Sequence, residues 1–194
     1  MKAVLPMTLV VLAIAKVGLV MGQDPAPSPT TPARQRVIPG QEVLKKWVGQ
    51  WDATVESTGR DGKLVTSPAK STSRLAFGDR WLISEFEGTL FGAPFTGQEV
   101  LGYDPVAKRF LLNWIDSIAT SFATGEGIFD PKTNTMIWTV SSRDDSTGKL
   151  TTWHQVDIWK DADHHDWSIR ATKDGKEQIQ MTIRYRRRAS QGSN

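Results

Sequence analysis

From about Trp51 to Arg187 the sequence consists of short stretches in which apolar and polar residues alternate, each ended by turn-forming residues. Alternation with a period of two is typical of half-buried β-strands. The turn signals recur about every ten residues, at Gly59–Gly62, Gly78-Asp79, Gly88–Pro94, Asp104-Pro105, Ser117–Thr120, Asp130-Pro131, Asp144–Gly148, Asp161–Asp163 and Asp174-Gly175. The pattern therefore predicts ten strands joined in sequence. Successive hairpins favour an up-and-down barrel over a sandwich, because closure leaves no strand edge exposed.

One helix is predicted, ahead of the first strand. From about Gln41, the residues Val43, Leu44, Trp47 and Val48 fall on one helical face, and Gly49 ends the segment. We therefore expect an all-β fold, an antiparallel barrel of about ten strands with one short N-terminal helix.

Folding the central hairpins about their turns assigns an inside and an outside to the barrel. A turn at Ser117–Thr120 places Trp114 opposite Ala123 and Phe110 opposite Gly127. A turn at Asp130–Thr133 pairs Phe129 with Asn134, and one at Asp104–Ala107 pairs Leu101 with Phe110, Glu99 with Leu112 and Gly97 with Trp114. The face predicted to line the interior holds Glu99, Leu101, Tyr103, Phe110, Leu112, Trp114, Phe129, Met136, Trp138 and Val140.

The C-terminal hairpins continue this interior. Trp153, Gln155, Asp157 and Trp159 share a face with His165, Trp167 and Ile169. We predict a three-residue turn at Asp174–Lys176 with Gly175 left-handed, since it brings the apolar residues of the last strand to the same face. Those residues are Ile179, Met181, Ile183 and Tyr185.

The N-terminus has the features of an export signal. Lys2 precedes an apolar run that ends near Gly22, and the small residues there predict cleavage before Gln23. The rival interpretation, a retained membrane anchor, is disfavoured by Lys16 within the run. We expect a signal peptide at 1–22, a linker with four prolines at 23–36, the barrel domain at 37–188 and a disordered tail at 189–194. The predicted location is secreted or periplasmic, with no membrane span after cleavage.

Charge and composition narrow the partners and the chemistry. Loss of Lys2 and Lys16 with the signal lowers the formal net charge from +3 to near +1. Four arginines cluster near the C-terminus, at 184 and 186–188, so the rest has no basic face and we expect no nucleic-acid partner. The chain has no cysteine, which excludes disulfides and thiolate chemistry.

No metal site or cofactor is predicted. His154 falls on the outer face, and the adjacent His164 and His165 point to opposite faces. Asp161–Asp163 resembles the start of a calcium loop, but Asp166 stands where that loop needs glycine and Thr172 where it needs glutamate. The sequence also contains no nucleophile elbow and no phosphate-binding glycine loop, so no catalytic residue is assigned.

Inward acids and tryptophans are the candidate site. Glu99, Asp116 and Asp157 fall among aromatic residues, where a carboxyl group must be paired or change its pKa. Alternatively, each lies at a solvated barrel rim. A ten-stranded barrel is wider than side chains alone fill, so an aromatic-lined cavity is plausible. The predicted ligand-binding residues are Glu99, Tyr103, Phe110, Trp114, Asp116, Trp138, Trp153, Trp159 and Trp167.

Several motifs together resemble the bacterial domain-of-unknown-function family 1579. The similarity covers about Leu44 to Arg187, through Trp47–Trp51, Ser71–Arg74, Glu85–Gly88, Pro94–Gly97, Leu101–Asp104, Trp114–Asp116 and Asp174–Lys176. The resemblance implies a lipocalin-like, calycin-type barrel of no established activity.

Gly49-Gln50-Trp51 is also similar to the G-x-W of lipocalins. That resemblance implies that Trp51 plugs the barrel base and that a late arginine, Arg184 or Arg186, covers its ring. The haem-binding nitrobindin barrels are similar in shape, but Asp52–Val55 stands here in place of their glycine-rich segment, so haem is not expected.

Three functional hypotheses follow. The first is an exported barrel that binds a small, largely apolar molecule among the tryptophans. The second is a hydrolase or isomerase that uses the inward acids. The third is a filled barrel that acts as a structural or protein-interaction module, meeting its partner through the arginine cluster or the loop 88–94. Cavity volume distinguishes the third from the other two, and the sequence makes no prediction of oligomeric state.

Overall fold

A computed structural model describes residues 40–58, 62–90, 92–173 and 176–189. These residues all belong to Gln35–Asn194, the second of two units into which the chain divides. The predicted signal, the predicted linker and residues 190–194 of the predicted tail lie outside the described residues, so their assignments stay predictions.

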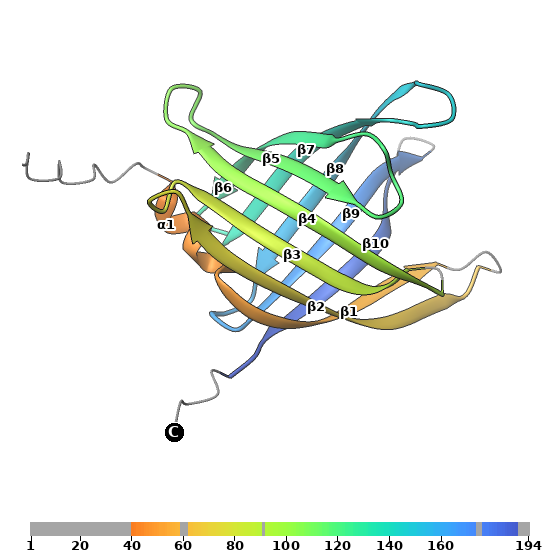
Figure 1. The fold of residues 1–194 in the computed structure, drawn as a ribbon, viewed down its shortest axis with the longest axis horizontal. Helices are drawn as coiled ribbons and strands as arrows, with labels where there is room; N and C mark the ends of the chain where they lie inside the picture. The colour runs from red at the N-terminus through yellow and green to blue at the C-terminus, as the bar shows by residue number, and fades with distance from the viewer. Residues whose placement is uncertain (1–39, 59–61, 91, 174–175, 190–194) are drawn as a thin grey trace, which may run out of the picture. The chain divides into compact units, whose positions relative to one another are not determined.

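The described residues form a closed antiparallel barrel of ten strands, as predicted (Figure 1). Each strand pairs with its neighbours in the chain, and the first pairs with the last. The strands are β1 (Gly49–Thr58), β2 (Leu64–Ala76), β3 (Trp81–Leu90), β4 (Ala93–Asp104), β5 (Arg109–Asp116), β6 (Ala123–Asp130), β7 (Thr135–Arg143), β8 (Leu150–Trp159), β9 (His164–Lys173) and β10 (Lys176–Arg187).

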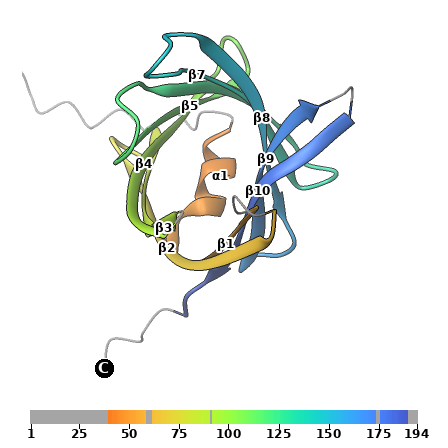
Figure 2. The ribbon, with the colours of Figure 1, turned by 90° about the vertical axis from the view of Figure 1, so that its right-hand side faces the viewer.

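The predicted helix is present as one α-turn, α1 (Gln41–Leu44), continued by a 3-10 turn, η1 (Lys45–Trp47). In the view along the barrel, α1 lies inside the ring of strands (Figure 2). Its apolar residues Leu44 and Trp47 are buried, at 0% and 6% exposure. Gly40, just before α1, lies so close to Tyr103 that an added Cβ would overlap the tyrosine ring. The short helix therefore plugs one end of the barrel.

The predicted facing of the central strands is confirmed, but two of the predicted registers are wrong. Phe129 pairs with Met136 rather than Asn134, and Leu101 pairs with Leu112 rather than Phe110. Each observed pairing is shifted by two residues, which leaves every side chain on its predicted face.

Both shifted hairpins contain the same turn. Asp104 and Asp130 each precede a proline, and each carboxylate accepts backbone N–H bonds inside its turn, from Val106 and Ala107 or from Lys132. The fourth turn residue is left-handed in both, with φ of 54° at Lys108 and 55° at Asn134. The turn therefore occupies the four residues after the aspartate, not four residues that begin with it.

The last hairpin corrects a third prediction. Lys173 pairs with Lys176 across residues 174–175, which lie outside the described residues, so no three-residue turn joins β9 to β10. The register instead shifts at a β-bulge between Ile179 and Met181. Met181, Ile183 and Tyr185 face inward as predicted, whereas Ile179 is 58% exposed.

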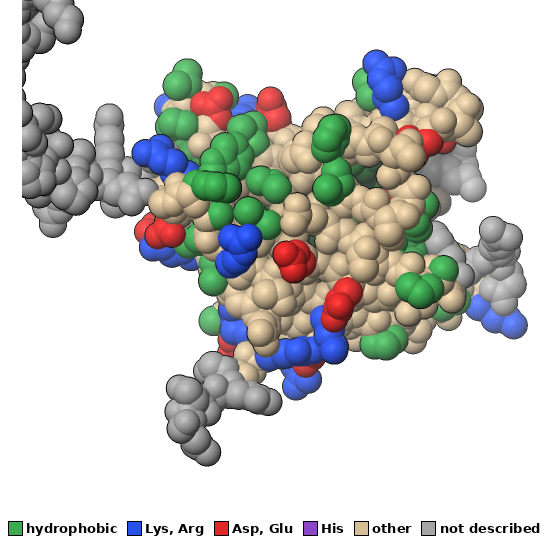
Figure 3. Space-filling model, viewed as in Figure 1, with side chains coloured by type: hydrophobic (Ala, Val, Ile, Leu, Met, Phe, Trp, Pro, Cys, Tyr) green, Lys and Arg blue, Asp and Glu red, His purple; other side chains and the backbone are tan. Residues whose placement is uncertain are grey.

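The arginine cluster belongs to the wall of the barrel and not to a free tail. Arg184 pairs with Glu56, Arg187 with Asp163, and both Arg186 and Arg188 with Asp52. On the face drawn in Figure 3, acidic and basic side chains lie close together rather than in fields of one sign. Among the described residues, no helix is long and apolar enough to cross a membrane.

Candidate ligand-binding cavity

The barrel interior has two unlike halves. At the end plugged by α1 and η1, large apolar side chains pack densely. They include Leu44, Trp47, Leu82, Leu101, Phe110, Leu112, Met136, Trp138, Val140 and Trp159. The other half contains a cavity of about 440 Å³ that reaches Leu90 and Ile118 at the opposite end and is bounded at its inner end by side chains of the first half such as Trp47, Leu101 and Trp138. We call the first half the closed end and the second half the cavity.

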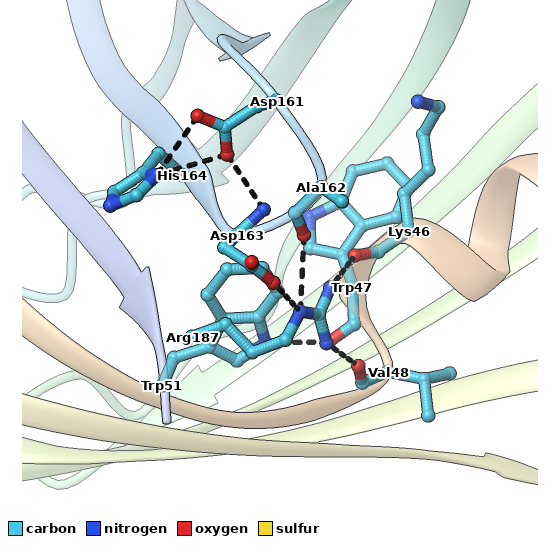
Figure 4. A network of polar contacts seen from close by, with 9 residues as sticks. All are labelled: Lys46, Trp47, Val48, Trp51, Asp161, Ala162, Asp163, His164 and Arg187. Carbon is cyan, nitrogen blue, oxygen red and sulfur yellow. Dashed lines mark hydrogen bonds and ion pairs between the residues drawn. The ribbon is translucent and has the colours of Figure 1, made fainter. Parts of the chain in front are cut away.

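A single arginine ties the closed end together, and it is neither of the two predicted (Figure 4). Arg187 lies with its guanidinium carbon 4.0 Å from the centre of the Trp51 ring. The same guanidinium donates to the backbone carbonyls of Val48, Lys46 and Ala162. The prediction of Arg184 or Arg186 was wrong because these residues point outward, while Arg187 is the register partner of inward Trp51.

The backbone conformation and the close approach of Arg187 explain why position 49, the first of the G-x-W motif, is a glycine. Gly49 has φ of 129°, and a Cβ on it would lie 2.6 Å from Nη1 of Arg187. Glycine therefore allows both the left-handed backbone and the approach of the guanidinium. Trp51 itself is 1% exposed, and its indole N–H donates to the Trp47 carbonyl at 2.8 Å.

The cavity exists because small polar residues occupy inward positions on β2 and β3. Ser71, Ser73 and Ser84 all line it and are buried. The Ser73 hydroxyl donates to that of Ser84 at 2.8 Å, so these groups satisfy each other across the strand pair. Serines in place of leucines leave space that larger side chains fill at the closed end.

Four ionisable side chains meet at the inner wall of the cavity: Glu99 on β4, Asp157 on β8, His165 on β9 and Tyr185 on β10. We call them the inner polar cluster. Asp157 accepts the Trp138 indole N–H at 3.0 Å, and its other oxygen lies 3.6 Å from Nδ1 of His165. The His165 ring stacks on that of Tyr185, with centroids 4.4 Å apart and an interplanar angle of 3°.

Burial sets the protonation of this cluster. It raises the pKa of Glu99 to about 8, and the charge of Asp157 adds to the shift. It also raises the pKa of Tyr185 well above 10, with smaller contributions from Glu99 and Asp157. Among the described residues none donates a hydrogen bond to the Glu99 carboxyl group, which faces the cavity. Glu99 is therefore predominantly a neutral acid at pH 7.

Asp116 differs from Glu99 and Asp157 because its carboxylate accepts hydrogen bonds from the turn that follows it. Its carboxylate accepts the backbone N–H groups of Ile118 and Ala119, each at 2.8 Å, and the Trp114 indole N–H at 2.8 Å. Burial alone would raise the pKa of Asp116, but these hydrogen bonds outweigh it and hold the pKa below its ordinary value. Asp116 lies at a strand end and shapes the turn between β5 and β6, which agrees with the rim alternative.

The nine residues predicted to bind a ligand divide between the two halves. Those that line the cavity are Glu99, Trp114, Asp116, Trp138, Trp153 and Trp167. Tyr103, Phe110 and Trp159 instead pack at the closed end, where Trp159 meets Trp47 edge to face at 4.4 Å. The structure therefore places six of these side chains at the cavity and three away from it.

Sequence reasoning missed the importance of His165 and Tyr185. The alternation had placed both inward, but neither was nominated as a site residue. His165 is 3% exposed, and its Nδ1 has no hydrogen-bond partner, so it is an incompletely satisfied polar group at the cavity wall. The available signal was an inward histidine diagonal to an inward aspartate on the preceding strand, since His165 pairs with Trp159, two residues after Asp157.

The other histidines lie away from the cavity. His154 is exposed on the outside, and His164 pairs with Asp161 at 2.9 Å. Over residues 40–58, 62–90, 92–173 and 176–189, no group of three or more histidine or acidic side chains is placed to hold a metal ion.

Known structures share this barrel. The crystal structure of Rv2717c from M. tuberculosis matches with a TM-score of 0.56 and 14% identity, covering 79% of this chain and 100% of that one. The S-type phycobiliprotein lyase CPES from Guillardia theta matches with a TM-score of 0.53 and 14% identity, covering 78% of this chain and 93% of that one. At this identity the likeness shows a lipocalin-like fold and nothing finer.

Sequence comparison gives the family. No curated protein matches the chain. The family model described as "Protein of unknown function (DUF1579)" matches residues 39–187, which span the whole barrel. The resemblance seen in the sequence is confirmed, and the chain belongs to the DUF1579 family.

Proposed function

We propose that this protein binds a small, largely apolar molecule inside the barrel. The observation that carries the proposal is the cavity of about 440 Å³, a size typical of small-molecule sites. Its walls are mainly aromatic and aliphatic, with a few polar groups at the inner wall, which is the usual composition of such sites. One structural neighbour with this fold is named a phycobiliprotein lyase, and its named role adds support for a barrel with a function beyond its own structure.

Two substitutions on β10 test whether a ligand enters the cavity. Met181→Trp adds bulk to a residue that lines the cavity, whereas Ile179→Trp adds the same bulk to an exposed residue on the outer face. The probe is N-phenyl-1-naphthylamine, an uncharged fluorophore that brightens in apolar sites. We expect the wild type and Ile179→Trp to bind it with similar affinity and Met181→Trp to bind it at least about tenfold more weakly.

Two results would contradict the proposal. Equal binding by the two variants would place the fluorophore outside the cavity. A broad panel of apolar compounds that changes neither tryptophan fluorescence nor melting temperature would remove the binding function.

A second candidate function is acid–base catalysis, favoured by the raised pKa of Glu99. A carboxyl group with a pKa of about 8 can donate and accept a proton near neutral pH. Under this hypothesis Glu99→Gln abolishes turnover of a hydrolase or isomerase substrate while the barrel stays folded. The third hypothesis, a structural module, expected a filled barrel, and the cavity of about 440 Å³ speaks against it.

We also propose that the barrel acts after export, in the periplasm or outside the cell. The basic start and apolar run of residues 1–22 support this location. N-terminal sequencing of the protein recovered from cell fractions tests it. A mature chain that begins at Gln23 would agree, and an intact Met1 in the cytoplasm would contradict it.

A further inference from the structure

The carboxyl groups that line the cavity are not balanced by basic side chains. Its lining includes three carboxyl groups, Glu99, Asp116 and Asp157, but no lysine or arginine among the described residues. The guanidinium of Arg187 lies against the ring of Trp51, which lines the cavity, but it is bound to Asp163 and to backbone carbonyls. Its hydrogen bonds are therefore used at the closed end, and no arginine or lysine of the described residues lines the cavity beside the inner polar cluster.

Two of the three carboxyl groups are left incompletely bonded. Asp116 is satisfied by its turn, as described above. Asp157 is 3% exposed, and it accepts one indole hydrogen bond and lies beyond hydrogen-bond distance of His165. Glu99 accepts none from the described residues. Buried carboxylates normally have a positive partner, because desolvation otherwise makes the charged form costly.

The surroundings of the two acids suit a positive charge. Glu99 lies opposite Trp114 across β4 and β5, and Asp157 lies opposite Trp167 across β8 and β9. Both tryptophans line the cavity, so each acid has an indole beside it on the neighbouring strand. Aromatic faces next to carboxylates attract organic cations, since the ring quadrupole and the negative charge act in the same direction.

We infer that the ligand of this cavity is an organic monocation, an amine or quaternary ammonium group on an apolar skeleton. Its charged group lies between Glu99 and Asp157, and its skeleton lies among the tryptophans. The inference rests on the proposed binding function and narrows it to one class of compound. An uncharged apolar ligand would use neither carboxyl group, and an anionic ligand would be repelled by Asp157.

Binding of a cation is expected to release a proton from Glu99. In the empty cavity burial raises the pKa of this group to about 8, and a bound positive charge favours the ionised form. The titratable groups that face Glu99 are Asp157 on β8, His165 on β9 and Tyr185 on β10, with Asp116 farther out on β5. Because the pKa of Tyr185 lies well above 10, the tyrosine stays neutral over the range of interest. Affinity for a cation should therefore rise with pH up to about 8 and level off above it.

A matched pair of compounds tests the inference. Benzyltrimethylammonium carries a fixed positive charge, and neopentylbenzene is its uncharged carbon isostere, so the two differ mainly in charge. Phenylacetate supplies an anion on a similar skeleton. Each is titrated into the full-length barrel at pH 6.5 and pH 9, with tryptophan fluorescence as the readout and displacement of N-phenyl-1-naphthylamine as a check. At pH 9 we expect the cation to bind at least about tenfold more tightly than the isostere, and phenylacetate to bind most weakly.

Two variants locate the effect. Glu99→Gln should bring the preference for the cation over its isostere close to one and flatten the pH dependence. Glu126→Gln makes the same change at an exposed glutamate on the outside of β6 and should keep the wild-type preference. Circular dichroism establishes that both variants are folded.

The outcomes separate this inference from the proposed function. If the isostere or phenylacetate binds as tightly as the cation, or if cation affinity is the same at both pH values, the inference is wrong while a binding barrel remains. If the uncharged fluorophore and all three compounds fail to bind, both are wrong.

Discussion

The closed end and the cavity are built from the same strands and the same alternation of side chains, yet one is full and the other is hollow. At the closed end, inward positions carry residues such as Met136, Trp138 and Val140, each exposed by 1% or less. In the cavity the corresponding positions on β2 and β3 carry Ser71, Ser73 and Ser84. The size of the inward residue, and not the width of the barrel alone, decides where space remains.

The polar groups differ between the halves in the same way. At the closed end the Arg187 guanidinium is matched by Asp163 and backbone carbonyls, and the Trp159 indole N–H is the unpaired exception among the described residues there. At the cavity wall the Glu99 carboxyl and the His165 Nδ1 lack hydrogen-bond partners among the described residues. Dense packing and the Arg187 network stabilise one half, whereas looser packing and unpaired polar groups leave the other able to receive a ligand.

The largest expected effect comes from truncating a tryptophan in each half. Trp51→Ala removes a ring that is 1% exposed and covered by Arg187, and we expect it to lower the free energy of unfolding by about 3–5 kcal/mol. Trp167→Ala should lower it by less than half as much, because the Trp167 ring is only partly buried. Urea denaturation measures both. Equal losses would mean that the two halves are packed alike.

Adding a methyl group probes the same contrast from the opposite direction. A Cβ at Gly127 would overlap the Trp138 ring, and a Cβ at Gly97 would overlap the Trp114 ring. Trp138 is held by Asp157 and by dense neighbours, so Gly127→Ala should cost about 1–3 kcal/mol. Trp114 is only partly buried, whereas Trp138 is 1% exposed, so Gly97→Ala should cost less and should reduce the affinity for any cavity ligand. Thermal unfolding and fluorophore binding measure the two effects, and a larger stability loss for Gly97→Ala would contradict this account.

The buried acid makes stability depend on pH. The pKa of Glu99 rises from 4.5 in the unfolded chain to about 8 in the barrel. The folded state therefore holds a proton that the unfolded state releases, and stability falls as pH rises from about 4.5 through about 8. Between pH 6 and pH 8 we expect Glu99 to account for a loss of about 2 kcal/mol in the free energy of unfolding.

Denaturation curves of variants separate Glu99 from the other titrating groups. Glu99→Gln should remove most of the slope between pH 6 and pH 8, and Glu126→Gln should keep it. If the free energy of unfolding of Glu99→Gln falls between pH 6 and pH 8 as steeply as that of the wild type, the pKa of Glu99 is not raised in the barrel. The carboxyl group would then be hydrated at the cavity wall.

The sequence predicted the strands and their inward faces, but it did not predict the register of every hairpin. Alternation and turn spacing determine which residues face inward, and they correctly predicted ten strands and the inside of β4 to β9. They cannot determine the register of the hairpins at Asp104 and Asp130, because a shift by two residues conserves every facing. Only the geometry of the turn, with Lys108 and Asn134 left-handed, selects between the alternatives. The bulge before Met181 was missed for a related reason, since an extra residue in a strand and one in a turn change the alternation identically.

The aromatic residues of the site were predictable from the sequence, but its serines and its inner polar cluster were not. Trp114, Trp153 and Trp167 were found because inward aromatic residues stand out in an alternating pattern. The width of the barrel predicted a cavity but not its position, which depends on serines of β2 and β3 whose facing was not predicted. The meeting of Glu99 with His165 and Tyr185 was also out of reach, since it joins strands that are not neighbours in the sheet.

Arg187 gives the smallest expected effect and the sharpest test of how the closed end is held. Trp51 faces inward and pairs with Arg187, so facing alone already favoured this residue over Arg184 and Arg186. Lysine keeps the charge but cannot reproduce the planar set of donors that reaches three carbonyls and Asp163, so Arg187→Lys should cost about 1 kcal/mol. Arg184→Lys, at an exposed ion pair with Glu56, should change stability by less than about 0.5 kcal/mol.

Hydrogen exchange shows where the stability held by Arg187 resides. In Arg187→Lys, amide exchange should quicken at residues 45–49, where the guanidinium binds the carbonyls of Lys46 and Val48, and stay unchanged along β5 and β6, which border the cavity. The positions at which amide exchange quickens are more informative than the size of the loss in stability. If exchange quickened evenly around the barrel, Arg187 would stabilise the sheet as a whole, and the closed end would not be a separately fastened plug. A local effect would show that the plug can loosen without opening the cavity wall, so that the full half and the hollow half of one barrel are stabilised by different residues.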